Sequence, residues 1–153
     1  MALEPYLRRT AAILEEGPLT RDDLIARIAA CVAAHAPTLR LEAVRDATLA
    51  REGAGLTVTG DGVAFPHASL DAASEPLVVP CLVRHGVSFA DTLPPARLIL
   101  FSVGSRRDPG VHIRILARLA RCALSADARE RLLAATDGAD LVERLLAEDR
   151  SHG

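Results

Sequence analysis

His67 is the side chain whose type and surroundings point most directly to chemistry. It follows Pro66, and the fixed φ of proline restricts the backbone there and holds the preceding Phe65 extended. We therefore expect the imidazole to be held in position and partly exposed. A neutral imidazole is a competent nucleophile near pH 7, so His67 could accept a phosphoryl group as a phosphoramidate and pass it on. From spacing alone, a structural role for His67 in a loop is the alternative.

The chain contains no lysine. All 18 of its strongly basic residues are arginine, which excludes a Schiff-base lysine, a Walker A lysine and a kinase-type lysine. Two glycine pairs, Gly53-x-Gly55 and Gly60-x-Gly62, do not complete the G-x-G-x-x-G pattern of a nucleotide loop. Group transfer would have to use arginine and histidine, and we expect no cofactor.

The composition is that of a globular protein with little net charge. Of 153 residues, 50% are hydrophobic and 25% are charged, and the net charge is −2. These values argue against a nucleic-acid partner, and no apolar run is long enough for a membrane span. We expect one domain over residues 1–153, with 1–18 as a lead-in segment, and a cytoplasmic location.

The cysteines give no sign of a metal site or a disulfide framework. Cys31, Cys81 and Cys122 are odd in number and form no C-x-x-C pair. We expect no bound metal, and we expect Cys81 and Cys122 to lie in the core because both fall on apolar faces.

Helical patterns flank a β-rich centre. Thr20 can cap a helix that runs to about His35, and a second helix is expected over 41–52. The lead-in segment is expected to form an edge strand or a short helix. After Pro109 we expect three further helices: one to about 123, one from Ser125 to 133 and one over 139–148. The first of these carries an apolar face made of Ile113, Leu116, Ala117, Ala120 and Ala123.

The centre of the chain changes to the period of β-structure. Residues 56–59 and 63–65 are expected to form a hairpin around Gly60-Asp61-Gly62, with Asp61 as a turn residue. Residues 77–83 and 97–103 resemble strands buried on both faces, and Pro80 indicates an edge, a bulge or a late strand start. Together these patterns predict an α/β fold: a mixed central β-sheet flanked by helices on both faces, in a three-layer α/β/α sandwich.

The whole run from Arg51 to His67 is more specific than its parts. It matches R-E-x-x-G-x-T-x-x-G-[DN]-G-V-A-x-P-H, which resembles the signature of the fructose- and mannitol-type IIA domains of the phosphoenolpyruvate-dependent sugar phosphotransferase system, including their nitrogen-regulatory relatives. A G-[IV]-x-F element at residues 86–89 agrees with the same family. The resemblance extends from about Thr20 to about Leu146.

This resemblance implies a site and a function. It aligns His67 with the phosphorylated histidine, His112 with the second histidine of the site and Arg51 with the arginine that faces the phosphoryl group. Arg51 could bind two phosphoryl oxygens, and a protonated or hydrogen-bonded His112 could add a donor. The implied partners are an HPr-like phosphocarrier protein as donor and a IIB component as acceptor, the latter of which can belong to a membrane transporter.

Other interpretations remain open at this point. A regulatory protein-binding module controlled by phosphorylation is the alternative function, and a degenerate member without transfer is a third. Leu56 and Val58 replace residues that are usually Ser and Gly in the family, which predicts an altered pocket rim, and Ala68-Ser69 also departs from the common pattern. Five arginines could form a solvated basic ridge or a docking surface beside the site: Arg106, Arg107, Arg114, Arg118 and Arg121. His35, His85 and His152 are expected to be structural or exposed.

Overall fold

The computed structural model describes all 153 residues. The helices are η1 (Glu4–Tyr6, a 3-10 helix), α1 (Arg21–His35), α2 (Leu41–Ala54), α3 (Pro109–Cys122), α4 (Ala126–Leu133) and α5 (Gly138–Ser151). The strands are β1 (Ile13–Glu15), β2 (Val63–Ala64), β3 (His67–Leu70), β4 (Leu77–Val87) and β5 (Ala96–Ser105). None of the helices combines the length and apolar character that a membrane crossing needs.

The strands form one mixed sheet around an antiparallel pair. β4 and β5 are antiparallel, β1 is parallel to β4, and both β2 and β3 are parallel to β5. β2 and β3 follow each other along the same edge of β5, separated by Phe65 and Pro66. In this register His67 lies directly opposite Ser102. The sheet therefore places the start of β3 on an edge, next to the middle of β5.

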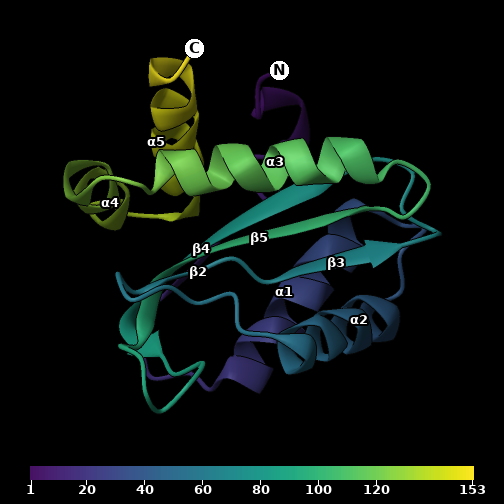
Figure 1. Cartoon of the computed structure of the whole chain (residues 1–153), viewed down its shortest axis with the longest axis horizontal. Coiled ribbons are helices and arrows are strands. Elements are labelled where there is room, and N and C mark those ends of the chain that lie inside the picture. The colour runs from purple at the N-terminus through teal and green to yellow at the C-terminus, as the bar shows by residue number, and fades with distance from the viewer.

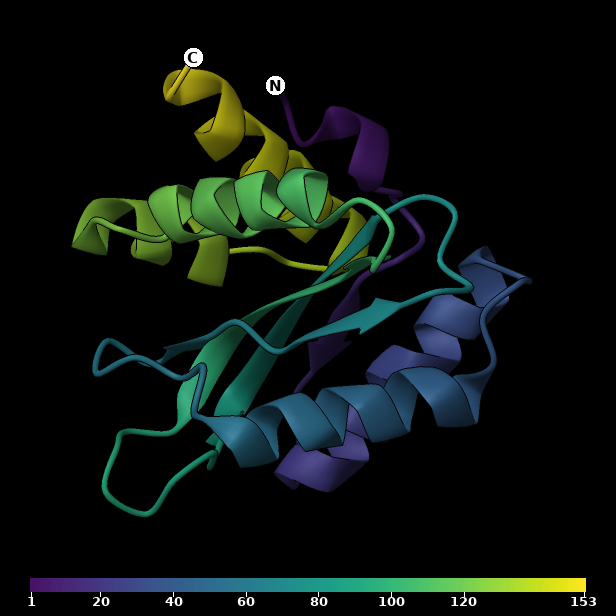
Figure 2. The same cartoon turned by 45° about the vertical axis from the view of Figure 1, so that its right-hand side comes forward.

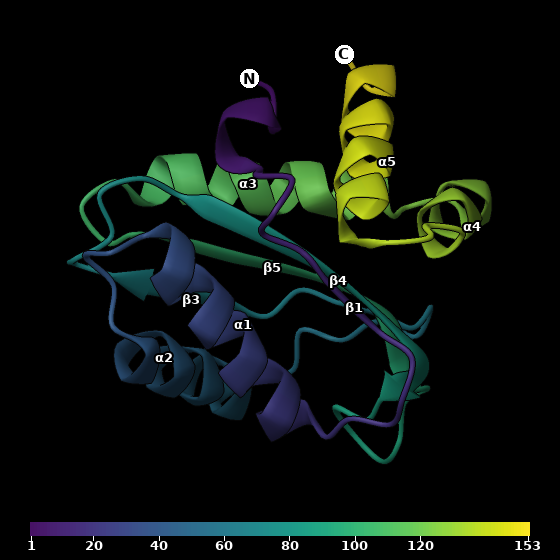
Figure 3. The same cartoon turned by 180° about the vertical axis from the view of Figure 1, so that it is seen from behind.

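Helices cover both faces of the sheet (Figures 1 and 2). α1 and α2 lie on one face, where a core of 22 buried residues includes Ile28, Val79 and Phe101. α3, α4, α5 and the N-terminal η1 lie on the other face, over a second core of 17 buried residues. The view from behind shows β1 at the edge opposite β3 (Figure 3). The predicted three-layer α/β/α arrangement with a mixed sheet is confirmed.

Polar side chains begin three of the helices. The Thr20 hydroxyl accepts a hydrogen bond from the Asp23 amide at 3.1 Å, and the Ser125 hydroxyl accepts one from the Ala128 amide at 3.1 Å. These contacts satisfy amides that have no partner within their own helix, and they confirm both predicted starts. α5 is capped in the same way by Asp137, whose carboxylate accepts from the Asp140 amide at 2.8 Å.

The lead-in segment contains both elements that the sequence offered as alternatives. η1 comes first, and β1 then forms the sheet edge. The Leu3 amide donates to the Asp149 carboxylate of α5 at 2.8 Å, and the same carboxylate is paired with Arg118 of α3 at 2.7 Å. The first residues are thus fixed to the last helix over the face that α3 covers.

The expected hairpin around Asp61 is reduced to a single bridge, so the prediction of a strand over 56–59 is wrong. Val58 and Ala64 form one antiparallel bridge, and Gly62 takes the positive φ of +77° that the turn requires. β2 is only two residues long and pairs in parallel with β5 instead. The sequence analysis also missed β3, since it expected His67 to follow a strand, whereas His67 begins one.

Pro80 lies within β4 without disrupting it. The pairing of β1 with β4 begins only at Cys81, so Pro80 has a strand partner, Leu100 of β5, on one side and lies outside the β1 register on the other. Proline is tolerated at such an edge position because no neighbouring strand needs a hydrogen bond from its backbone nitrogen there. Of the three explanations offered from the sequence, the edge position is the one observed.

The apolar face expected for α3 is wrong at Ile113, Ala117 and Ala120, whereas Ala123 is buried as expected and Leu116 is half-buried. The buried residues of this helix are His112, Ile115, Leu119 and Cys122, whereas Ile113 is 65% exposed. The helix carries apolar residues on two neighbouring stripes, and packing against β5 buries the one that includes His112. The other stripe, with Ile113, Ala117 and Ala120, faces solvent.

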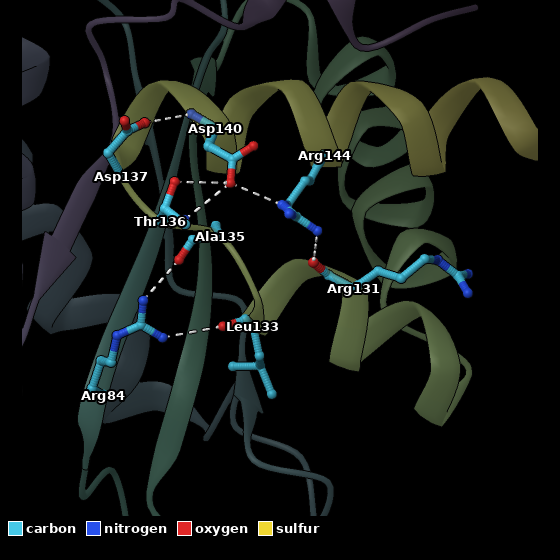
Figure 4. Close-up of polar contacts among 8 residues, drawn as sticks. All are labelled: Arg84, Arg131, Leu133, Ala135, Thr136, Asp137, Asp140 and Arg144. Carbon is cyan, nitrogen blue, oxygen red and sulfur yellow. Dashed lines mark hydrogen bonds and ion pairs between the residues drawn. The ribbon is translucent and has the colours of Figure 1, made fainter.

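The loop between α4 and α5 is held by side chains rather than by regular backbone pairing (Figure 4). The Arg84 guanidinium of β4 donates to the carbonyl oxygens of Leu133 at 3.2 Å and of Ala135 at 2.7 Å. Arg144 donates to the Arg131 carbonyl at 2.9 Å and to the Asp140 carboxylate at 2.9 Å. Each of these guanidinium groups therefore connects two or more segments of the chain.

Candidate functional site

His67 is the first residue of β3, and its ring has a defined hydrogen-bonding state. Its Nδ1 lies 3.0 Å from the Phe65 carbonyl oxygen. A carbonyl can only accept, so Nδ1 must carry the proton that it donates. The neutral ring then has its lone pair on Nε2. Pro66 stands between the two partners and restricts the backbone that joins them, and the side chain is half-buried.

His112 lies close to His67 but is almost completely buried. The two ring centroids are 5.6 Å apart, with an interplanar angle of 86°. His112 is 4% exposed and lies in the first turn of α3, with Nε2 2.9 Å from the Ser102 hydroxyl and Nδ1 3.3 Å from the Ser69 hydroxyl.

Burial decides the charge of His112. Burial, and to a smaller extent the neighbouring His67, lower the pKa of His112 to about 4. The imidazole is therefore neutral at pH 7. Of the two forms considered from the sequence, the protonated one is wrong for this protein before any phosphate arrives, and the hydrogen-bonded one is observed.

Gly104 makes room for the His112 ring, and sequence reasoning missed it. A Cβ atom on this residue would lie 2.5 Å from Cγ of His112 and 2.6 Å from its Nδ1, closer than such atoms approach one another. Glycine within a buried strand, here one residue from the end of β5, signals a close approach of this kind. That signal was present in the sequence, but the approaching group could be known only from the fold.

Arg51 lies near the end of α2 and shares a shallow pocket with His67. Its Nη1 donates to the Gly55 carbonyl at 2.8 Å, which helps to close the end of the helix. The pocket has a volume of about 230 Å³ and is lined by Arg51, His67, Ser69, Arg106 and three alanines of α2 and β3, Ala47, Ala50 and Ala68. It lies along the exposed edge of the sheet, where Figure 2 shows β3 between α2 and α3.

The structure thus brings all three sequence-predicted residues to one edge of the sheet, in two layers. His67 and Arg51 line the pocket, whereas His112 lies beneath it and connects to it through Ser69. Ser69 and Ser102 belong to the site although neither was predicted. They could not be found from spacing, since they meet His112 only through the pairing of β3 with β5.

The expected ridge of five arginines is wrong in one member. Arg118 turns inward and pairs with the buried Asp149 carboxylate, leaving its side chain 11% exposed. Arg106 lies at the pocket, where its guanidinium is 4.0 Å from the Asp71 carboxylate. Arg107, Arg114 and Arg121 are exposed. The positive charge at the site therefore comes from Arg51 and Arg106.

The departures from the family pattern have less effect on the pocket than expected. Val58 is buried in the core beneath α1 and α2, and Leu56 is exposed. Neither residue lines the pocket that contains His67. The prediction that these two substitutions alter the pocket rim is therefore wrong, and the departures that do reach the pocket are Ala68 and Ser69.

The remaining candidate residues have structural roles or are exposed. Cys81 and Cys122 are buried as predicted, and burial raises the pKa of the Cys122 thiol to about 12, so it stays protonated. His35 is bonded to the Cys31 carbonyl at 2.8 Å, whereas His85 and His152 are exposed. Asp61 lies in the turn and faces Arg129 at 3.7 Å. No three His, Cys, Asp or Glu side chains are grouped to hold a metal ion.

Comparison with known proteins agrees with this fold and gives the family. Residues 6–148 match the family model described as phosphoenolpyruvate-dependent sugar phosphotransferase system, EIIA 2. The chain is 33% identical over 136 residues to the fructose-specific EIIA component of the phosphotransferase system from Haloferax volcanii, covering 88% of each protein.

Two solved structures share the fold. The nitrogen regulatory protein IIA-Ntr from Neisseria meningitidis superposes with a TM-score of 0.85 at 22% identity, covering 94% of this chain and 98% of the other. IIA mannitol from Escherichia coli superposes with a TM-score of 0.74 at 23% identity, covering 90% and 97%.

Fold, histidine pair and family match define a phosphocarrier subunit. The chain belongs to the EIIA type 2 family of the phosphoenolpyruvate-dependent sugar phosphotransferase system, and it is an EIIA component of that system.

Proposed function

We propose that Nε2 of His67 accepts a phosphoryl group from the phosphohistidine of an HPr-like protein and passes it to a cysteine of a IIB component. The observation that carries this proposal is the hydrogen bond from Nδ1 to the Phe65 carbonyl. It leaves the lone pair on Nε2 and holds the ring while that nitrogen attacks phosphorus.

The atoms of the transfer balance without a cofactor. The Nε2 lone pair forms the new N–P bond while the N–P bond of the donor phosphohistidine breaks, and Nδ1 keeps its proton. In the second step a thiolate of the IIB component attacks phosphorus, the N–P bond to Nε2 breaks, and the lone pair returns to His67. We expect both exchanges in the cytoplasm.

Arg51 and Arg106 would stabilise the charge in transit. Both line the pocket beside His67, and neither is in close contact with a carboxylate. A phosphoryl group brings up to two negative charges, and such transfers are catalysed mainly by positioning and by charge stabilisation. Because His112 is neutral, it would contribute no charge, and it would act only through its hydrogen bonds.

The exposed stripe of α3 would receive the partner protein. Ile113 is 65% exposed and directly follows His112, and Leu124, just beyond the end of the helix, is 76% exposed. Arg114 and Arg121 are exposed on the same helix. An apolar strip bordered by arginines is typical of a surface that binds a partner with acidic residues around its own apolar patch. The partner would then recognise this patch, since the net charge of the whole protein is small.

Fructose is the sugar class that the Haloferax volcanii relative favours. The Haloferax volcanii protein that is 33% identical to this chain carries the fructose-specific name. The alternative is a regulatory module whose contacts with a target protein depend on phosphorylation. Leu56 and Val58, whose departure from the family pattern would favour this alternative by altering the pocket rim, do not line the pocket, so the carrier function is the one that we propose.

Phosphoryl transfer from phospho-HPr tests the proposal. We expect the wild type to take up label and to pass it to a fructose-type IIB component. His67→Ala should take up none, while His85→Ala, which changes an exposed histidine away from the pocket, should be labelled like the wild type. Equal labelling of His67→Ala would overturn the proposal, and label that never leaves for IIB would favour the regulatory alternative.

A further inference from the structure

Two serine hydroxyls hold the ring of His112 from opposite sides. Ser102 of β5 meets Nε2 at 2.9 Å, and Ser69 of β3 meets Nδ1 at 3.3 Å. A neutral imidazole has one N–H donor and one acceptor nitrogen. The two hydroxyls must therefore play opposite roles, and only two arrangements of the protons are possible.

Burial of Ser102 selects between the two arrangements. This residue is 0% exposed, and the only hydrogen bond of its hydroxyl is the one to His112. If Nε2–H donated to Ser102, the buried hydroxyl proton would have no acceptor, at a substantial cost in free energy. If Ser102 donates to Nε2, every buried proton of the pair is used. The second arrangement is favoured, so Nδ1 carries the proton of His112.

The consequence reaches the pocket through Ser69. Nδ1–H of His112 then donates to the Ser69 oxygen, and the proton of the Ser69 hydroxyl remains free. Ser69 lines the same pocket as His67 and Arg51, and its hydroxyl has no hydrogen bond besides the one to His112. His67 and Ser69 are two residues apart on β3, so their side chains leave the strand on the same face.

We propose that Ser102, His112 and Ser69 form a directed hydrogen-bond chain that presents the Ser69 hydroxyl proton to the phosphoryl group on His67. Ser69 would touch the phosphoryl group, whereas Ser102 and His112 would act as positioning residues that fix the direction of the chain. This inference rests on the proposed function of His67. The opposite direction would make Ser69 donate to Nδ1 and leave it nothing to offer the phosphate.

The tautomer of His112 tests the direction without any phosphate. In 15N-labelled, unphosphorylated full-length protein at about pH 7, two-bond 1H–15N correlations should identify His112 as the Nδ1–H tautomer. Ser102→Ala removes the donor to Nε2 and should shift His112 towards the Nε2–H tautomer, whereas Ser102→Thr keeps a hydroxyl and should retain the wild-type pattern. An Nε2–H tautomer in the wild type would overturn the proposal.

The equilibrium of phosphorylation tests the contact made by Ser69. A hydrogen bond to a charged group is worth enough that Ser69→Ala should lower the equilibrium constant for phosphorylation by phospho-HPr about tenfold. Ser69→Thr should restore it, and Ser88→Ala, which changes an exposed serine elsewhere, should have no effect. If the wild type is phosphorylated and Ser69→Ala has the same equilibrium constant, the proposed hydrogen-bond chain is wrong and the proposed function of His67 stands. A wild type that takes up no phosphate would overturn the proposed function and with it the role of Ser69.

Discussion

The arginines at the α4–α5 loop and those at the edge of the sheet beside β3 differ in how many protein partners they have. At the α4–α5 loop, the guanidinium groups of Arg84 and Arg144 each donate to two or more carbonyl or carboxylate oxygens of different residues (Figure 4). At the edge of the sheet beside β3, Arg51 has a single carbonyl partner and Arg106 lies 4.0 Å from the nearest carboxylate. A guanidinium that joins several segments of the chain stabilises the fold, whereas one with few protein partners can bind an incoming anion.

This contrast shows how arginine can serve both kinds of site in a chain without lysine. Where several backbone carbonyls must be held at once, the planar fork of arginine is the better donor, and where a phosphoryl group must be bound it offers two parallel hydrogen bonds. Under the proposed function, the chain uses the same side chain for both tasks. What separates them is the number of partners already present, which the sequence does not display.

The largest effect on the structural side should come from Arg118. Its ion pair with Asp149 is buried, and the same carboxylate accepts from the Leu3 amide. Arg118→Ala would leave a buried, incompletely compensated carboxylate, and it should lower the free energy of unfolding by about 4 kcal/mol. Urea denaturation measures this change. Arg45→Ala, which removes an exposed pair with Asp46, is the control and should change stability by less than about 0.5 kcal/mol. Equal effects of the two would contradict the contrast.

The buried histidine should make stability depend on pH. Because the pKa of His112 is about 4 in the folded protein and about 6.5 when unfolded, the unfolded state binds the extra proton between these values. Stability should therefore be full above about pH 6.5 and fall as the pH approaches 4, by about 3 kcal/mol from this group. His112→Asn does not titrate there and should lose less stability over that range. Parallel curves for the two proteins would show that His112 is not held neutral.

On the functional side, Arg51 should matter for transfer and little for folding. Arg51→Ala should slow phosphorylation by phospho-HPr about a hundredfold, because a guanidinium beside the transferred group is removed. Arg45→Ala again serves as the control, since it lies on the same helix outside the pocket. Rapid-quench labelling measures the rate. A large loss of stability in Arg51→Ala, with an unchanged rate, would place Arg51 among the structural arginines instead.

The smallest expected effect belongs to Arg84. Its side chain donates to two loop carbonyls and pairs with Glu16 at 3.0 Å. Arg84→Ala should lower the free energy of unfolding by about 2 kcal/mol, since two carbonyls lose a charged donor. Thermal unfolding followed by circular dichroism checks this, and the phosphorylation rate of the folded protein should be unchanged. Slower phosphoryl transfer with an unchanged free energy of unfolding would contradict a purely structural role for Arg84.

Much of the architecture could be predicted because local signals agree with it. Thr20 and Ser125 mark helix starts by their hydroxyls, and both caps are present. The buried strands are apolar enough to stand out, and helices on both sides of them imply three layers. The motif ending in Pro66 and His67 pointed to a half-buried histidine, as observed, although not to the strand that His67 begins.

The rest could not be predicted because it depends on contacts between distant segments. α3 has two apolar stripes, and only packing against β5 decides that Ile115 is buried and Ile113 exposed. Ser102 reaches the site because the register of β3 on β5 sets it opposite His67. Gly104 is needed because His112 of a different element approaches it, and Arg118 turns inward because Asp149 lies there. None of these partners is adjacent in sequence.

The central claim is that phosphate is carried on Nε2 of His67 while Nδ1 keeps its hydrogen bond to Phe65. Nitrogen–phosphorus correlated NMR of the 15N-labelled protein, phosphorylated by phospho-HPr, tests it most directly. The account predicts a single phosphohistidine, with the phosphorus coupled to Nε2 of His67 and a proton retained on Nδ1. Phosphorus bonded to Nδ1 of His67, or to either nitrogen of His112, would contradict it.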